Sequence, residues 1–154
     1  MIALALLTLD LPPGRSAFAE ASPPAATPHG GDPDSGGCVE DAATLCLGEG
    51  DRFRLRVFWA PPGGQPAAAR KISIGMRDSG LFYFFDPDNV EILVKVLDGC
   101  AINDYYWIFY AATTTVEFRL TVEDIESRQV LEYPNPAGMT AVPVTDVTGF
   151  DSCP

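Results

Sequence analysis

The sequence predicts an all-β fold: an antiparallel β-sandwich of about seven or eight strands, held together by disulfide bonds. Three observations predict it. Apolar and polar residues alternate with a period of two, turn-forming residues separate the short apolar segments, and four cysteines lie between residues 38 and 153. A small β-barrel is the alternative architecture, because it uses the same pattern of short strands.

Two segments show the alternation most clearly, residues 52–60 (RFRLRVFWA) and 115–124 (TVEFRLTVED). We expect both to be half-buried strands with one wet face, which carries the arginines of the first segment. Residues 81–85, 90–97 and 105–110 are apolar on both faces, apart from Glu91 and Lys95, as central strands are. Shorter candidate strands are Thr44–Leu47, Lys71–Gly75, Gln129–Tyr133 and Ala141–Thr145. No long stretch carries a helical apolar stripe.

Turn residues stand between these segments. Residues 86–89 (DPDN) combine a proline, which presets the backbone, with Asp and Asn side chains that bond to the local main chain. Residues 125–128 are expected to join the next pair of strands, and residues 61–65 (PPGGQ) form a longer loop.

The N-terminal part of the sequence predicts a leader followed by a linker. Residues 1–19 hold an apolar run, Ile2–Leu9, followed by Ala17-Phe18-Ala19, which resembles a signal-peptidase site. No base precedes the run, so we expect a truncated signal peptide; a disordered apolar N-terminus is the alternative. The run is too short to span a bilayer. Residues 20–37 have four prolines and four glycines and predict a disordered linker. The domain is expected at 38–154.

Charge and histidine content exclude several classes of function. The chain has 21 acidic and 10 basic residues, a net charge of −11, so it repels nucleic acid and disfavours anionic membranes. The single histidine, His29, falls in the linker. Triad hydrolases need a placed imidazole, and zinc sites need several imidazole or thiolate ligands, so we expect neither. The sequence favours a protein that is not an enzyme.

The cysteines predict two disulfides and an oxidising compartment, because no pair has the spacing of a metal site. We therefore expect a secreted protein, extracellular or periplasmic. Of the three pairings, Cys38–Cys46 with Cys100–Cys153 is favoured. Pairing Cys38 with Cys153 stays open, because chain ends often lie close together.

Four strings resemble an uncharacterised β-sandwich module of secreted and surface proteins of bacteria. They are CVEDAATLCL (38–47), FFDPDNVE (84–91), VKVLDGC (94–100) and the final Cys153-Pro154. That module occurs alone behind a signal peptide or appended to exported proteases and other extracellular proteins. The resemblance covers nearly all of residues 38–154. It implies an exported, modular protein and no particular mechanism.

Two groups of residues are candidates for a site. Asp86, Asp88, Asn89 and Glu91 offer oxygen ligands that suit Ca²⁺, although the glycine and the final glutamate of an EF-hand loop are missing. A hydrogen-bonded turn explains them better, so no metal and no cofactor is favoured. The second group is a candidate binding face of Tyr105, Tyr106, Trp107 and Tyr110. One of two alternating sets, either Tyr105, Trp107 and Phe109 or Tyr106, Ile108 and Tyr110, must be core.

The expected function is that of a non-catalytic extracellular module for accessory binding or adhesion, with a protein or a polysaccharide as partner. The alternatives are a small secreted hydrolase that uses two carboxylates, or an inhibitor of a secreted enzyme that presents the loop 61–66. The sequence does not indicate an oligomeric state.

Overall fold

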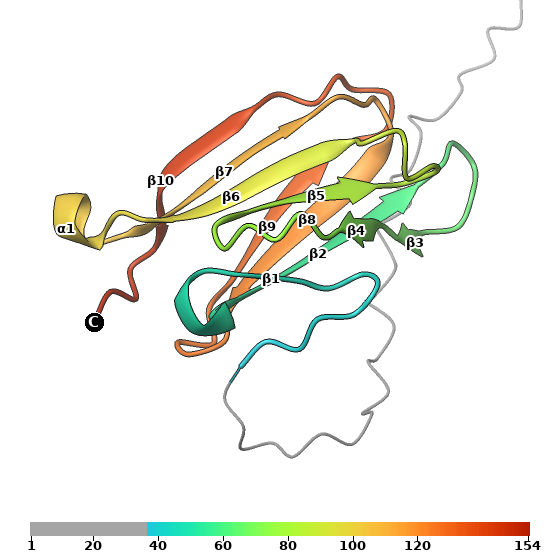
Figure 1. The fold of residues 1–154 in the computed structure, drawn as a ribbon. Helices are drawn as coiled ribbons and strands as arrows, with labels where there is room; N and C mark the ends of the chain where they lie inside the picture. The colour runs from blue at the N-terminus through green and yellow to red at the C-terminus, as the bar shows by residue number, and fades with distance from the viewer. Residues whose placement is uncertain (1–36) are drawn as a thin grey trace, which may run out of the picture.

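The computed structural model describes residues 37–154 and has two antiparallel sheets packed face to face (Figure 1). The leader and residues 20–36 of the linker lie outside the described residues. The first sheet has the strand order β1-β2-β8-β9, with β3 also paired to β2, and the second has the order β10-β7-β6-β5-β4. The strands are β1 (Leu45–Leu47), β2 (Phe53–Ala60), β3 (Ala67–Ala68), β4 (Arg70–Ile72), β5 (Ser79–Tyr83), β6 (Ile92–Asp98), β7 (Tyr106–Ala112), β8 (Glu117–Asp124), β9 (Val130–Asn135) and β10 (Val144–Phe150). The sheets do not close into a barrel, so the predicted sandwich is confirmed.

The described residues hold ten strands where seven or eight were predicted, and two short helical turns, η1 (Glu49–Asp51) and α1 (Cys100–Asn103). The last strand also starts later than Ala141. Pro143 has no N–H for a ladder, which suits a strand that begins only at Val144. Helix α1 has four residues, too few to show a stripe, and the Asp98 carboxylate accepts the N–H of Cys100 at 2.9 Å where it begins.

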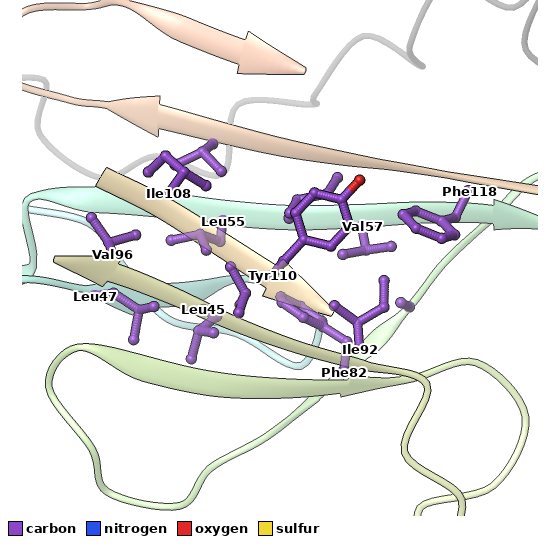
Figure 2. Packing of buried hydrophobic residues seen from close by; sticks show 14 of the residues in the cluster. Leu45, Leu47, Leu55, Val57, Phe82, Ile92, Val96, Ile108, Tyr110 and Phe118 are labelled. Carbon is purple, nitrogen blue, oxygen red and sulfur yellow. The ribbon is translucent and has the colours of Figure 1, made fainter. Parts of the chain in front are cut away.

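The core lies between the sheets and is built by the alternating residues of each strand (Figure 2). Leu55, Val57 and Leu120 of the first sheet face Val94 and Ile108 of the second, and all five are fully buried. Burying one such side chain stabilises the fold by about 1.5–3 kcal/mol. The period of two in residues 52–60 and 115–124 therefore predicted the inward positions correctly.

The two long sides of the sandwich are closed differently. On one side the chain itself passes from the first sheet to the second at Ala69, which is fully buried between β3 and β4. Leu45 of β1 also reaches Gly80 of β5 so closely that any added side-chain atom there would overlap it. On the other side the Tyr133 hydroxyl of β9 donates to Asp146 of β10 at 2.8 Å.

Both favoured disulfides are present, Cys38–Cys46 and Cys100–Cys153, each with its Cα atoms 5.7 Å apart. The alternative pairing of Cys38 with Cys153 is therefore wrong. The first bridge folds the start of the domain onto β1, and the second ties the end of the chain to α1. Within residues 37–154, no helix has the length and apolar character needed to cross a membrane.

Candidate binding face

Strand β7 divides the aromatic segment between two environments. Ile108 and Tyr110 are buried in the core, and Tyr110 packs edge-on against Phe118 and Tyr133, with ring centroids 6.3 and 5.6 Å apart. Tyr106 also points inward and lies 4.9 Å from the Phe53 ring. The set Tyr106, Ile108 and Tyr110 is therefore the core set.

Two members of the candidate face, Tyr106 and Tyr110, consequently belong to the core. The other two, Tyr105 and Trp107, stay half-buried at the surface. Phe109 joins Trp107 on the side of the sheet that faces away from the core, because successive side chains of a strand alternate. The structure does not gather all four predicted residues on one surface.

The residues that face away from the core on the second sheet form a largely apolar surface, here called the outer face. The strand register places Leu81, Leu93 and Ala111 side by side in one row and Leu97 beside Trp107 in another. Leu93 is 41% exposed and Val147, on β10, is 44% exposed. The full set is Arg70, Ile72, Ser79, Leu81, Tyr83, Leu93, Lys95, Leu97, Trp107, Phe109, Ala111, Thr145 and Val147.

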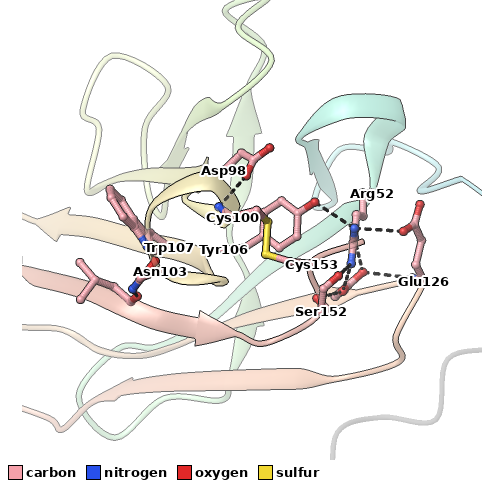
Figure 3. The surroundings of a disulfide bond; sticks show 11 residues. Arg52, Asp98, Cys100, Asn103, Tyr106, Trp107, Glu126, Ser152 and Cys153 are labelled. Carbon is pink, nitrogen blue, oxygen red and sulfur yellow. Dashed lines mark hydrogen bonds and ion pairs between the residues drawn. A yellow bond between two sulfur atoms is a disulfide. The ribbon is translucent and has the colours of Figure 1, made fainter.

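The Trp107 ring has a fixed place on this surface (Figure 3). Its indole N–H donates to the Asn103 side-chain oxygen at 2.8 Å, and the Asn103 amide donates to the carbonyl of Val147 at 2.8 Å. The ring lies against Gly99, where a Cβ would overlap the indole. Phe109 follows with its ring 6.0 Å away and inclined by 12°. Helix α1, β7 and β10 together therefore orient one aromatic pair.

The corresponding face of the first sheet carries ion pairs, although Phe58 and Val130 also lie on it. Arg54 pairs with Glu123 across β2 and β8 at 2.9 Å, and Arg119 pairs with Glu132 across β8 and β9 at 3.7 Å. Such exposed pairs contribute little to stability, but they cover the sheet with charge. The two faces of one sandwich thus differ in character.

Charge is distributed just as unevenly. None of the 13 residues of the outer face is an aspartate or a glutamate, although the chain has 21 of them. The face instead carries two bases, Arg70 at one edge and Lys95 in the middle of β6. An apolar surface without acids in an acidic protein is the most distinctive surface property of the described residues.

A second candidate site surrounds Arg52 at the end of the sandwich (Figure 3). The sequence predicted that Arg52 lies on a solvent-exposed face of its strand. Arg52 is instead only 9% exposed, because it precedes β2 and its guanidinium turns toward Ser152, near the C-terminal end of the chain. It donates to both oxygens of Asp124, at 2.9 and 2.7 Å, and to the Tyr106 hydroxyl at 3.0 Å. It also donates to Ser152, and pairs with Glu126 at 3.1 Å.

The Asp124 carboxylate is equally satisfied. Burial alone would raise the pKa of Asp124, but hydrogen bonds from Arg52, Ser152 and Ser127 hold that pKa well below its usual range. Each guanidinium nitrogen of Arg52 and both carboxylate oxygens of Asp124 have a partner within the protein. The arrangement is that of a structural ion pair rather than of a reactive group.

A hollow of about 290 Å³ lies beside this cluster, lined by Glu49, Asp78, Asp98 and Glu126 among others. Three of these acids already have partners: Asp78 pairs with Arg77, Asp98 accepts the N–H of Cys100, and Glu126 pairs with Arg52. Among residues 37–154, no three His, Cys, Asp or Glu side chains are grouped so as to hold a metal ion.

In the acidic turn, the candidate ligand oxygens accept hydrogen bonds from the same segment of the chain. Asp86 accepts the backbone N–H of Asp88 at 2.8 Å. Glu91 is buried, and its two oxygens accept the N–H of Phe84 and the amide of Asn89, each at 2.6 Å. Burial raises the pKa of Glu91, against the hydrogen bond from Phe84. These bonds shape a turn between β5 and β6.

No family model, no curated protein and no solved structure matches this chain. The resemblance to a module of exported bacterial proteins therefore stays a prediction. The candidate face rests on the geometry alone. Sequence reasoning found Trp107 but missed Leu93 and Leu97, because it assigned residues 90–97 to a strand buried on both faces. Lys95 is the one charged residue among Leu93, Lys95 and Leu97, and by itself it did not mark this side of β6 as exposed.

Proposed function

We propose that the protein is a non-catalytic extracellular binding module that engages its partner through the outer face of the second sheet. One observation carries the proposal: an apolar surface with an oriented Trp107–Phe109 pair and no acid, opposite a face covered by ion pairs. Contiguous exposed apolar patches on soluble proteins mark sites of interaction. Tryptophan, moreover, is enriched among the residues that dominate binding energy.

The extracellular assignment is supported by the two disulfides. Disulfides persist in secreted and periplasmic proteins and are rare where thiols are kept reduced. The resemblance of the cysteine-containing strings to an exported module points the same way.

A carboxylate hydrolase has less support. Such an enzyme needs two carboxylates free to reach the scissile bond across a cleft. In the hollow beside Arg52, the side chains of Asp78, Asp98 and Glu126 are held by protein partners, and Glu91 lies elsewhere, in the turn before β6.

The proposal is tested with 1-anilinonaphthalene-8-sulfonate, a fluorescent apolar anion, and with two surface variants. Leu93→Asp places an acid on the outer face. Thr121→Asp places the same group on the first sheet, on the side that carries the ion pairs. We expect the native wild-type protein to bind the dye and Leu93→Asp to lose the signal. Thr121→Asp should keep it. Thermal melting shows whether both variants fold.

If the native protein leaves the dye unbound, the outer face offers no accessible apolar site and the proposal fails. A signal that both variants lower equally would also contradict it, since binding would then follow net charge rather than this surface.

A further inference from the structure

We infer that the partner of the outer face is an acidic amphipathic protein segment, one that presents aliphatic side chains together with a carboxylate that pairs with Lys95. The inference rests on the proposed function and specifies the class of its ligand. It depends on the position of Lys95, on the charges around it and on the kinds of side chain that surround it.

Lys95 stands near the centre of the outer face. It lies on β6 between Leu93 and Leu97, which share its side of the strand, and the register sets it between Ser79 of β5 and Phe109 of β7. It is exposed and makes no ion pair with any residue in the part of the chain that the structure describes. Three of its four neighbours are thus apolar, and among residues 37–154 its ammonium group has no counter-ion.

Because the outer face has two bases and none of its 13 residues is acidic, its charge is positive. Elsewhere the bases of the described sheets have acidic neighbours: Arg54 pairs with Glu123, Arg52 with Asp124, and Lys71 with Glu40. A partner that buries Lys95 without supplying a carboxylate would leave a desolvated charge unpaired, which costs binding free energy. Complementarity therefore requires an acid on the partner.

The aliphatic side chains of the outer face favour a protein over a sugar. Ile72, Leu81, Leu93, Leu97 and Val147 are aliphatic, and they pack best against other aliphatic groups. A polysaccharide presents hydroxyl groups that need donors and acceptors, and the outer face offers few polar side chains besides its two bases. A second copy docked face to face would bring two unpaired Lys95 groups into one interface without adding an acid.

The test uses two synthetic 18-residue helical peptides with the same leucine stripe, one with glutamates and the other with lysines on the polar face. Isothermal titration calorimetry measures their binding to the full chain. We expect the Leu/Glu peptide to bind at least tenfold more tightly, even though the protein's net charge of −11 favours the Leu/Lys peptide.

Two charge-matched variants locate the effect. Lys95→Glu should weaken binding of the Leu/Glu peptide about tenfold or more. Arg128→Glu changes the net charge by the same amount in the turn between β8 and β9 and should leave that affinity nearly unchanged. Lys95→Met should remove the preference for the Leu/Glu peptide while keeping the apolar contribution.

Several outcomes would overturn the inference and leave the proposed function standing. These are equal or tighter binding of the Leu/Lys peptide, binding of neither peptide while the dye still binds, and binding of cellohexaose or chitohexaose in place of peptides. A face-to-face dimer in sedimentation equilibrium that Leu93→Asp dissociates would likewise replace the inferred partner with a second copy. Failure of the dye to bind overturns both.

Discussion

Arg52 shows how one buried side chain joins distant parts of the chain. It precedes β2, and its partners are Asp124 at the end of β8, Tyr106 at the start of β7 and Ser152 beside the last cysteine. Its guanidinium also lies 4.6 Å above the Tyr106 ring. A planar group with five donors can serve all these acceptors at once, which a lysine cannot do.

Asp124→Asn should therefore be costly and should change the acid stability of the protein. The variant leaves Arg52 buried without its counter-ion, and we expect a loss of about 3–5 kcal/mol in the free energy of unfolding. Because the folded-state pKa of Asp124 is depressed, its stabilisation is present above the ordinary carboxyl pKa of about 4 and is lost as the pH falls below it. Urea unfolding from pH 7 to pH 2 measures both effects.

The matched control for this experiment is Glu123→Gln, which breaks the more exposed pair with Arg54 and should cost less than about 1 kcal/mol. An acid profile of Asp124→Asn that parallels the wild-type profile down to pH 2 would contradict the assigned role.

Glu91→Gln should act in the opposite direction. The folded-state pKa of Glu91 is raised, so ionisation costs no stability below the ordinary pKa of about 4.3 and costs more as the pH rises through the raised value. The amide can still accept the N–H of Phe84 and can donate to Asn89 once that side chain turns over. We expect melting at or above the wild-type temperature at pH 7, and no gain at pH 4.

Glu91→Ala is the comparison, since it removes both acceptors and should cost about 1–3 kcal/mol. If Glu91→Gln destabilises the protein as much as Glu91→Ala at pH 7, the burial of charge is not the dominant effect at this turn.

At the scale of elements, β1 and β5 meet where glycine leaves room for leucine. Gly80→Ala should destabilise the protein by about 1–3 kcal/mol, because the new methyl overlaps Leu45. In the Leu45→Ala background the same methyl enters the space that the leucine vacates, and its cost should shrink or change sign. A double-mutant cycle from chemical denaturation measures this coupling. The control is Gly37→Ala, where no atom lies within 4 Å of the new methyl, and it should have little effect. If the losses of unfolding free energy from Gly80→Ala and Leu45→Ala simply add in the double variant, the contact is contradicted.

The strands with a strict period of two were predictable from the sequence, and those without it were predicted less well. Phe53, Leu55 and Val57 could be assigned to the core because arginines mark the opposite side of β2. In β7 both sides are aromatic, so the sequence left open which set was inside. Hydropathy likewise could not separate the covered side of β6 from its exposed side, because Leu93 and Val94 look alike there. Arg52 was misplaced because its partners are far away in the sequence.

At the scale of the molecule, the disulfides fix both ends of the described domain. Titration of the denatured, unreduced protein with a thiol reagent should give no signal, because all four cysteines are paired. Reduction should release four thiols per chain, and two without reduction would contradict the pairing.

The two bridges should contribute unequally to stability. The chain-entropy model gives about 4 kcal/mol for Cys100–Cys153, whose cysteines lie 53 residues apart, and about 2.5 kcal/mol for Cys38–Cys46, whose cysteines lie 8 apart. Serine replacement of each pair, followed by chemical denaturation, should therefore weaken the protein more at the C-terminal bridge. The reverse order would show that strain or residual structure outweighs loop length.

The two long sides of the sandwich are closed differently, so we expect the sheets to separate locally at one side before the other. Where the chain passes between the sheets at Ala69, separation would require the backbone itself to move. At the side formed by β9 and β10, it requires release of the Tyr133–Asp146 hydrogen bond and of the ring contact between Tyr133 and Tyr110 of β7. Amide hydrogens of β9 and β10 should then exchange with solvent before those of β2 and β6. Strong alkali should hasten this opening, because the folded-state pKa of Tyr133 is raised and its ionisation favours the separated strands.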